Sequence, residues 1–296
     1  MTPIVRLRFQ VGARTLAAVP RRLVRVPFSL DAVLAATGPA LPTLPDDADG
    51  FLVTSLPETA RDAFDRRGLM CAVRQRYVRY HTDLDTGVEA WLAGLSASAR
   101  SGLKRKAKKL AAASDGVLDV RAYRTPAEIA VFHPLARAVS ATTYQERLLG
   151  SGLPEDTQHI ATLAAADRLR AWLLFINGSP AAYLCCTADG GSLRYDHVGH
   201  DPVHNDLSPG AVLQMEAMRQ LFEDRFARFD FTEGEGQHKR QFASGGTACV
   251  DLLLLRPTLA NRGVMTALRI FDAAMSGAKR AATHPALRRL ARKVRR

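Results

Sequence analysis

The segment Glu233–Lys239 gathers ionisable side chains within a few residues of one another. It follows Arg228–Thr232, where two phenylalanines alternate with polar residues and predict a strand that is buried on one face. Catalytic groups are often carried by loops that a rigid sheet holds in place. A carboxylate in such a loop can remove a proton from an amine or a hydroxyl group, so Glu233 is the first candidate for a general base. The alternative is a solvated turn without a chemical role.

The segment Asp206–Ala211 predicts the start of a helix. The first turn of a helix exposes unpaired N–H groups and a partial positive charge, so it favours phosphate groups. A glycine lets the backbone approach such a ligand closely. A plain capped helix, with a serine N-cap followed by proline, explains the same sequence. The residues that we expect around a bound phosphate are Leu207, Ser208, Pro209 and Gly210.

A third group of reactive side chains lies on a predicted strand, Ser192–Gly199. Alternation along a strand places Tyr195 and His197 on one face of the sheet, with Asp196 on the other. Either His197 or Asp196 could deprotonate an acceptor, directly or through a water molecule. A structural histidine with satisfied hydrogen bonds is the alternative for His197.

A run of strands and helices must position these three groups. Asn177-Gly178 is typical of a two-residue hairpin turn, and Gly190-Gly191 marks a second turn. Together they predict three successive antiparallel strands, followed by a helix and two further strands. The expected strands are Arg168–Phe175, Ala181–Thr187, Ser192–Gly199, Arg228–Thr232 and Ala248–Leu255, with a helix from Ser208 to about Arg225.

Upstream of these elements, Glu89–Ala113 gives the clearest helix signal, because apolar residues recur at every third or fourth position. Its basic residues favour a solvated face; the alternative is attraction of coenzyme A, tRNA or an anionic polymer. Thr125 and Glu128 predict a capped helix that runs to about Ala141. The remaining expected elements are strands at Ile4–Phe9, Arg21–Phe28, Phe51–Ser55, Leu69–His81 and Val117–Tyr123, and a helix from Pro57 to Gly68.

The composition excludes several classes of protein. Of the 296 residues, 47% are hydrophobic and 24% are charged, which is typical of a globular chain and not of a disordered or fibrous one. Neither a membrane-spanning run nor a signal peptide is recognisable, so we expect a cytoplasmic location. The four cysteines have no metal-ligand spacing, so we expect small core residues and no bound metal: Cys71, Cys185, Cys186 and Cys249.

The positive charge is concentrated near the C-terminus. The formal net charge is +12, and segment 257–296 holds ten basic residues against one acidic residue, a net +9. An inert solvated tail is the simplest interpretation. The alternative is peripheral contact with an anionic membrane at its inner face, where each basic residue contributes about 1 kcal/mol. We expect no specific nucleic-acid partner, since aromatic residues are not interleaved with the basic ones.

Residues 90–256 resemble the GNAT acyltransferases. Within these they are similar to the acetyltransferase-like domain related to the CelD/BcsL proteins of cellulose biosynthesis and to the FemAB-type ligases. Four stretches carry the resemblance: Leu95–Arg105, Asn177-Gly178, Ser208-Pro209-Gly210, and Phe229–Phe242 with its Phe-Asp-Phe-Thr-Glu-Gly and His-Lys-Arg-Gln-Phe elements.

This resemblance implies an α/β (α+β) fold with a GNAT-like mixed, mainly antiparallel twisted sheet flanked by helices. It also implies three segments. Residues 1–88 would form a reduced N-terminal GNAT-like lobe, and residues 89–256 the acyltransferase domain. Residues 257–296 would form a basic helical tail.

The resemblance also assigns roles to the candidate residues. In a GNAT fold, strand Ser192–Gly199 would diverge from Arg228–Thr232, and the acyl-pantetheine group would lie in the gap. Backbone N–H groups there could polarise the thioester carbonyl. A lysine in a comparable Lys-x-x-Phe context of FemAB-like relatives contacts an anionic substrate, which here indicates Lys239 with its neighbour His238. Tyr144 and Gln145 would line the acceptor pocket, although Tyr144 as a core aromatic residue is an equal alternative.

These observations predict an acyltransferase that uses acetyl-CoA or a longer acyl-CoA as co-substrate and no metal. The acceptor would be a small molecule or glycan precursor, such as a sugar, an amino acid or a polysaccharide precursor, acylated on nitrogen or oxygen. Two alternatives stay open. One is a FemAB-like transferase that uses aminoacyl-tRNA, and the other is a non-catalytic relative in polysaccharide biosynthesis.

Overall fold

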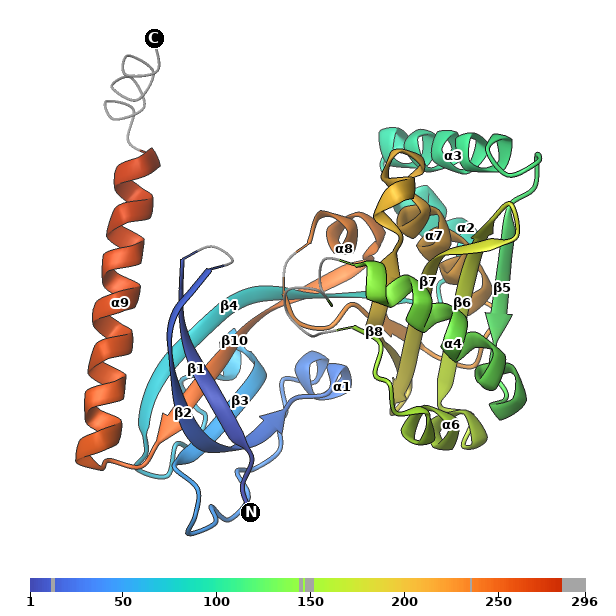
Figure 1. Ribbon diagram of the computed structural model, residues 1–296. Coiled ribbons are helices and arrows are strands. Elements are labelled where there is room, and N and C mark those ends of the chain that lie inside the picture. Colours follow the sequence, from blue (N-terminus) through green and yellow to red (C-terminus); the bar gives the residue numbers. More distant parts are fainter. Residues whose placement is uncertain (12–13, 144–145, 147–151, 235, 284–296) are drawn as a thin grey trace. The chain divides into compact units, whose positions relative to one another are not determined.

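The computed structural model describes residues 1–11, 14–143, 146, 152–234 and 236–283 (Figure 1). The chain divides into two compact units. Unit 1 comprises Met1–Phe28, Ala35–Arg76 and Cys249–Arg296, and unit 2 comprises Ser29–Leu34 and Tyr77–Ala248. Strands β4 (Met70–Asp83) and β10 (Gly245–Leu255) contribute residues to both units.

Unit 1 is built on strands in the order β1, β2, β3, β10, β4. β1 (Ile4–Val11) and β2 (Arg14–Pro27) are antiparallel, whereas β2 runs parallel to β3 (Gly50–Pro57). Apolar residues of the sheet and of helix α9 (Leu259–Thr283) form one core cluster, which includes Leu23, Leu253 and Met265. The core of unit 1 therefore depends on segments from both ends of the chain.

Unit 2 contains a second run of neighbouring strands, in the order β4, β9, β8, β7, β6, β5. Neighbours are antiparallel except β8 and β9, which are parallel. The bounds of these strands are Asp119–Tyr123 for β5, Leu169–Ile176 for β6, Ser179–Asp189 for β7, Ser192–His200 for β8 and Arg228–Asp230 for β9.

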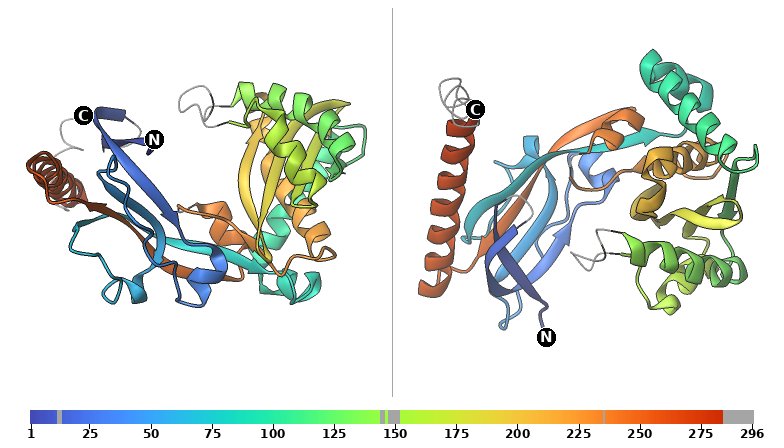
Figure 2. Two further views of the ribbon diagram at one scale, coloured as in Figure 1. Left: turned by 90° about the horizontal axis from the view of Figure 1, so that it is seen from below. Right: turned by 45° about the horizontal axis from the view of Figure 1, so that its top comes forward.

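Helices cover both faces of this sheet (Figure 2). Helices α4 (Pro126–Thr142) and α6 (Thr157–Ala165) pack on the face that carries Cys185. On the opposite face, which carries Cys186, lie α2 (Val88–Gly94), α3 (Ala97–Ala112) and α7 (Pro209–Leu221). Every residue of β6 is buried, as expected for a strand covered on both sides. The predicted mixed, mainly antiparallel sheet flanked by helices is confirmed.

Several local signals fold as expected. Thr125 and Glu128 form a capping box, in which each side chain accepts a hydrogen bond from the other residue's backbone N–H. Asn177 and Gly178 both have positive φ and join β6 to β7. Cys185 and Cys186 are buried on opposite faces of the sheet. Cys249 is also buried and Cys71 half-buried, which fits the expected packing role.

Two predicted helices are wrong in extent. The expected helix Glu89–Ala113 is interrupted, because Ser96 is extended and caps α3 by accepting the Ala99 N–H. Arg100 is exposed, as expected for a solvated face, and it also donates to three carbonyls at the end of α2. The expected helix Pro57–Gly68 reduces to a three-residue 3₁₀ helix, η1 (Glu58–Ala60). Gly68 and the residue before it have positive φ, which is incompatible with a continuing right-handed helix.

The compact units do not coincide with the predicted segments 1–88, 89–256 and 257–296. Residues 77–88 fall in unit 2, and residues 249–256 fall in unit 1. The functional division into lobe, catalytic domain and tail stays a prediction. Helix α9 forms much of the tail, and residues 284–296 lie outside the described residues. No helix in the described part of the chain is both long and apolar enough to cross a membrane.

Candidate functional site

The pairing between β8 and β9 ends part-way along β8. Three residues of each strand are paired, and the last pair is Arg194 with Asp230. From Tyr195 to His200, β8 has no β9 partner among the described residues. Strand β9 itself ends at Asp230, so β8 continues beyond its neighbour at the place where the sequence predicted a gap for the acyl group. The gap as a donor site stays a prediction.

A β-bulge lies immediately beyond this point. Cys186 of β7 pairs with Tyr195 of β8, but Cys185 pairs with His197, so Asp196 is an extra residue. A bulge leaves its extra residue out of the ladder and shifts the alternation of side chains. Tyr195 packs with Cys186 in the core below α7, whereas His197 shares the face of Cys185. The prediction that Tyr195 and His197 share a face is therefore wrong, and the bulge is the reason.

Ionisable side chains line one face of three neighbouring strands. Asp230 lies between Phe229 and Phe231, which are both buried in the core below α7, so its own side chain faces the opposite side of the sheet. Its register partners are Arg194 on β8 and His81 on β4, and side chains in register share a face. We call this surface the polar face and define it by Arg79, His81, Arg194, Asp196 and Asp230.

A buried ion pair lies at the centre of the polar face. The Nε and Nη2 atoms of Arg79 donate to the two carboxylate oxygens of Asp230, at 3.1 and 2.5 Å. Arg79 is 1% exposed and Asp230 0%. Asp230 also accepts the backbone N–H of Thr232 at 2.8 Å. This pair was not predicted from the sequence. The pattern that indicates it is one charged residue between large hydrophobic or aromatic neighbours in each of two predicted strands.

The Asp230–Thr232 contact positions the turn that carries Glu233. Thr232 and Gly234 both have positive φ, so the chain reverses sharply on either side of Glu233. The Lys239 Nζ donates to the Glu233 carbonyl oxygen at 2.6 Å. Burial lowers the pKa of Lys239, and the nearby charges of Glu233 and Asp230 oppose this shift. Glu233 and Lys239 therefore lie together beside the Arg79–Asp230 pair.

Lys239 and His238 belong to a helix where the sequence predicted a loop. Helix α8 (Gln237–Phe242) starts after Gly236 and buries Phe242 in the core below α7. The Phe242 carbonyl accepts hydrogen bonds from Trp91 and Thr82, which fixes the end of the helix. The His238 ring lies 6.0 Å from the Tyr195 ring, between centroids. Tyr195 therefore links the start of α8 to the point where β8 leaves β9.

Asp196 and His197 lie next to each other after the bulge. Asp196 accepts hydrogen bonds from the backbone and the hydroxyl of Thr187, and Arg194 Nε lies 3.3 Å from its Oδ1. Burial raises the pKa of Asp196, and the hydrogen bonds with Thr187 and the charge of Arg194 oppose it. Burial lowers the pKa of His197, against the charge of Asp196 and a hydrogen bond with the Gly152 backbone. A neutral imidazole can accept a proton, so His197 suits a base.

The start of α7 differs from an ordinary capped helix. Ser208 has a φ of 54°, and its side chain makes no capping hydrogen bond. Pro209 has no N–H, and the N–H of Ala211 donates to the Ser208 carbonyl. Gly210 thus supplies the one N–H of this turn for which the described residues provide no acceptor. Leu207 is buried at the end of a 3₁₀ helix, η2 (Pro202–Leu207). The alternative of a plain capped helix is not supported, because the Ser208 side chain makes no capping hydrogen bond; phosphate binding here stays a prediction.

The acceptor residues Tyr144 and Gln145 lie outside the described residues. Their neighbour Glu146 is described and forms an ion pair with Arg137 at 2.6 Å. Ser140 donates to Glu146 and accepts from the Tyr183 hydroxyl, so three elements converge there. The sequence analysis missed this network, because its members are spread over a helix, a strand and a loop.

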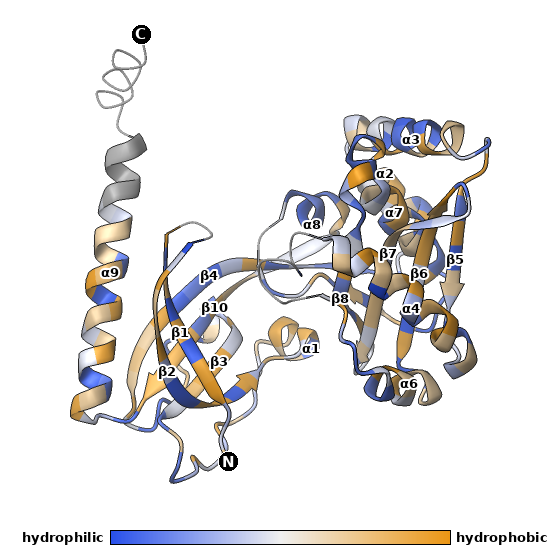
Figure 3. Cartoon of the chain, viewed as in Figure 1, coloured by the Kyte–Doolittle hydropathy of each residue, from blue (hydrophilic) through white to orange (hydrophobic). Residues whose placement is uncertain are grey.

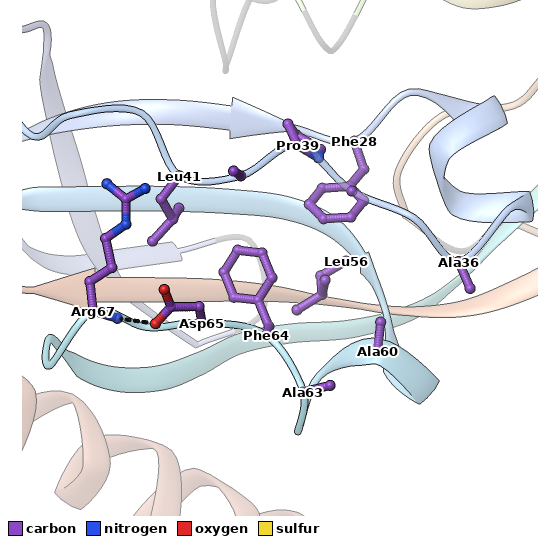
Figure 4. Close-up of a pocket in the computed structure, with 12 residues that line it drawn as sticks. Phe28, Ala36, Pro39, Leu41, Leu56, Ala60, Ala63, Phe64, Asp65 and Arg67 are labelled. Atoms are coloured by element: carbon purple, nitrogen blue, oxygen red, sulfur yellow. Dashed lines mark hydrogen bonds between the residues drawn. The ribbon is translucent and has the colours of Figure 1, made fainter.

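Unit 1 has an apolar pocket of about 290 Å³, well separated from these residues in sequence (Figure 4). The Phe28 and Phe64 rings, 6.2 Å apart between centroids, line it together with Leu56. Of the two charged residues in its lining, Asp65 accepts the backbone N–H of Arg67. This lining offers apolar contact and no pair of groups for acid–base chemistry.

Comparisons with known proteins agree with this fold. Residues 97–240 match the family described as Acetyltransferase (GNAT) domain. A search of curated proteins found no relative. Among solved structures, the chain is similar to the C-terminal domain of a protein described as a lysylphosphatidylglycerol synthetase from Agrobacterium fabrum. The identity is 12%, the TM-score is 0.50, and 75% of this chain and 72% of that one are covered.

Two further structures are similar. FemX is 11% identical with a TM-score of 0.47, and 86% of this chain and 88% of that one are covered. A GCN5-related N-acetyltransferase from Kribbella flavida is 15% identical with a TM-score of 0.41, and 72% of each chain is covered. The family match and the sheet together establish a GNAT-like fold and support a transferase function of the acyltransferase type. The CelD/BcsL subtype stays a prediction.

Proposed function

We propose that this protein transfers an acyl group from acetyl-CoA or a longer acyl-CoA to a nitrogen or oxygen atom of a polar acceptor. A sugar, an amino acid or a polysaccharide precursor has the required chemistry. The observation that carries the proposal is the end of the β8–β9 pairing at Arg194 and Asp230, next to the Asp196 bulge. The part of β8 that continues past the end of β9 has peptide groups without a β9 partner, and such groups can hold an extended thioester and polarise its carbonyl.

The donor side of the proposal uses α7. Gly210 supplies an N–H that has no acceptor among the described residues, at the positive end of a 13-residue helix. A Cβ at Gly210 would meet no atom closer than His200 Nδ1 at 3.5 Å, so the fold itself does not require glycine there. Space in front of a helix N-terminus suits the diphosphate of coenzyme A. Leu207, Ser208 and Pro209 would surround it.

The acceptor side uses the polar face and the start of α8. Lys239 is a half-buried cation beside Glu233, and a lysine serves as a point charge toward a carboxylate or phosphate. His238, next to it, lies against Tyr195 at the strand separation. An acceptor bound by Lys239 and His238 would present its nucleophile to the gap between the strands.

The chemical step is direct attack on the thioester. The lone pair of the acceptor forms a C–N or C–O bond with the carbonyl carbon, and the C–S bond then breaks to release coenzyme A. The acceptor's proton passes to a base of the enzyme, and the leaving thiolate takes up a proton. Glu233 is the first candidate for this base, with His197 and Asp196 as candidates on β8.

A thermal-shift titration tests the proposal. Acetyl-CoA and longer acyl-CoA esters should raise the unfolding temperature, because a ligand at one hundred times its Kd stabilises the folded state by about 2.7 kcal/mol. ADP serves as the control for a nonspecific nucleotide effect. If no CoA ester shifts the transition, the proposal fails, and an aminoacyl-tRNA-dependent or non-catalytic role becomes the better account.

A further inference from the structure

A polar groove lies within unit 2 between the first half of α3 and helix α8. Its volume is about 420 Å³. Neither helix contributes a carboxylate to it, whereas both contribute basic and amide side chains. The side chains that line it and can donate hydrogen bonds are Ser96, Ser98, Arg105, Lys106, Gln237, Arg240 and Gln241.

Three cations converge on this groove from two elements. Arg105 and Lys106 come from α3, and neither has an ion-pair partner among the described residues. Arg240 comes from α8, and its Nε donates to the Tyr80 hydroxyl at 3.2 Å, which fixes the guanidinium at the groove wall. The start of the 16-residue helix α3 adds a partial charge of the same sign.

Other basic residues of α3 differ from those in the groove, although hydrophilic residues recur along the whole helix (Figure 3). Arg100 donates to carbonyls at the end of α2, and Lys109 donates to the Asp206 carbonyl at 2.9 Å. These two residues therefore have structural partners. Lys104 and Lys108 are exposed and do not line the groove. Arg105 and Lys106 are thus the basic residues of α3 that line the groove.

Arg105 and Lys106, which have no ion-pair partner among the described residues, favour an anion with several acceptor oxygens in this groove. Guanidinium groups match phosphate oxygens in a bidentate manner, and the amides of Gln237 and Gln241 supply neutral donors beside them. Helix α8 also carries Lys239 and His238. A ligand in this groove would therefore contact the same helix as an acceptor bound on the proposed acceptor side.

We infer that the α3–α8 groove is a phosphate-binding subsite for the donor or the acceptor of the proposed reaction. This inference rests on the proposed function for the identity of the ligand, but not for the presence of the subsite. Two ligands of the proposed reaction carry a phosphate group that could bind there. One is coenzyme A, through its 3′-phosphate, and the other is a nucleotide-linked or lipid-linked acceptor, through its diphosphate.

Calorimetric titrations of the full chain test this inference. The probes are coenzyme A, 3′-dephospho-coenzyme A and inorganic pyrophosphate. The groove variant is Arg105→Gln with Lys106→Gln, and the matched control is Lys104→Gln with Lys108→Gln, which removes the same charge from the same helix. Circular dichroism of both variants verifies the fold. Tyr80→Phe is a second variant that removes the hydrogen bond between Arg240 and the Tyr80 hydroxyl without changing the charge.

Each possible result either supports the subsite or overturns it. If the groove variant weakens coenzyme A about tenfold but leaves 3′-dephospho-coenzyme A unchanged, the subsite holds the 3′-phosphate of the donor; loss of ~1.4 kcal/mol corresponds to that factor. If it weakens pyrophosphate alone, the subsite serves the acceptor. Equal behaviour of the groove variant and the control with all three probes overturns the inference. If the wild type binds pyrophosphate in the groove but no CoA ester, the proposed function fails and the subsite stands.

Discussion

Arg79 and Asp230 form a bidentate ion pair between β4 and β9, and neither side chain reaches solvent. The same carboxylate accepts the Thr232 N–H and so connects the pair to the turn at Glu233. A buried pair of this kind holds a geometry, because its desolvation cost offsets much of its attraction. The Arg79–Asp230 pair lies next to the turn at Glu233, which indicates that the pair positions Glu233 and Lys239.

Asp230→Asn should therefore destabilise the protein strongly, because it leaves the Arg79 charge buried without a counter-charge. We expect a loss of about 3–5 kcal/mol in the free energy of unfolding. Urea denaturation followed by circular dichroism measures it. Arg76→Gln, which removes an exposed ion pair with Glu58, is the control and should leave the midpoint unchanged. Equal midpoints for the two variants would contradict a structural role for the buried pair.

Glu233→Gln should reduce kcat without unfolding the chain, because the side chain is only half-buried and lies at a turn. Loss of a general base costs about 10²–10⁴-fold. Lys239→Met should instead act mainly on the KM of the acceptor, by about 10–100-fold, as expected for a lost charged hydrogen bond. Thiol release from acyl-CoA measures both. Full activity in both variants would contradict the assignment of the reactive side to α8 and its preceding turn.

The pH dependence of kcat/KM should report His197 if it is the base. Burial lowers its pKa below the ordinary value of 6.5, so activity should fall with decreasing pH only on the acid side of 6.5. Between the folded and unfolded pKa values the unfolded chain binds more protons, so stability should rise with pH in the same window. His197→Gln should remove the acid limb of activity. An acid limb that persists unchanged in this variant would assign the base to another residue, with Glu233 first.

Gly199→Ala should destabilise the site without touching a reactive group. A Cβ at Gly199 would lie 2.6 Å from the Tyr183 ring and 2.8 Å from the Thr143 side chain. Such overpacking typically costs about 1–3 kcal/mol. Thermal unfolding measures the loss, and Gly102→Ala is the matched control, because no atom lies within 4 Å of a Cβ there. A Gly199→Ala variant as stable as the control would show that β8 and the end of α4 are not tightly packed.

The sequence predicted the parts of the fold that local chemistry determines. The Asn177-Gly178 turn and the Thr125–Glu128 capping box need only neighbouring residues, and both form as expected. The strands next to Asn177-Gly178 followed from apolar runs between turn residues. The interruption at Ser96 was missed, because one apolar period continues through two separate helices.

The parts that depend on distant residues could not be predicted in this way. The bulge at Asp196 is a property of the pairing between β7 and β8, and no residue type within β8 predicts it. The Arg79–Asp230 pair joins residues 151 positions apart. The conformation of Ser208 also escaped prediction, because serine before proline is equally typical of an ordinary N-cap.

The central claim is that acyl-CoA binds at the start of α7 and in the gap where β8 leaves β9. Gly210→Ala tests it most directly, because a Cβ there would meet no protein atom closer than 3.5 Å but would occupy the space of a close-lying diphosphate. Isothermal titration calorimetry with acetyl-CoA should show saturable binding to the wild type. The variant should bind at least about tenfold more weakly, a difference of ~1.4 kcal/mol, with an unchanged unfolding temperature. Absence of binding to the wild type, or equal affinity in the variant, would contradict the account.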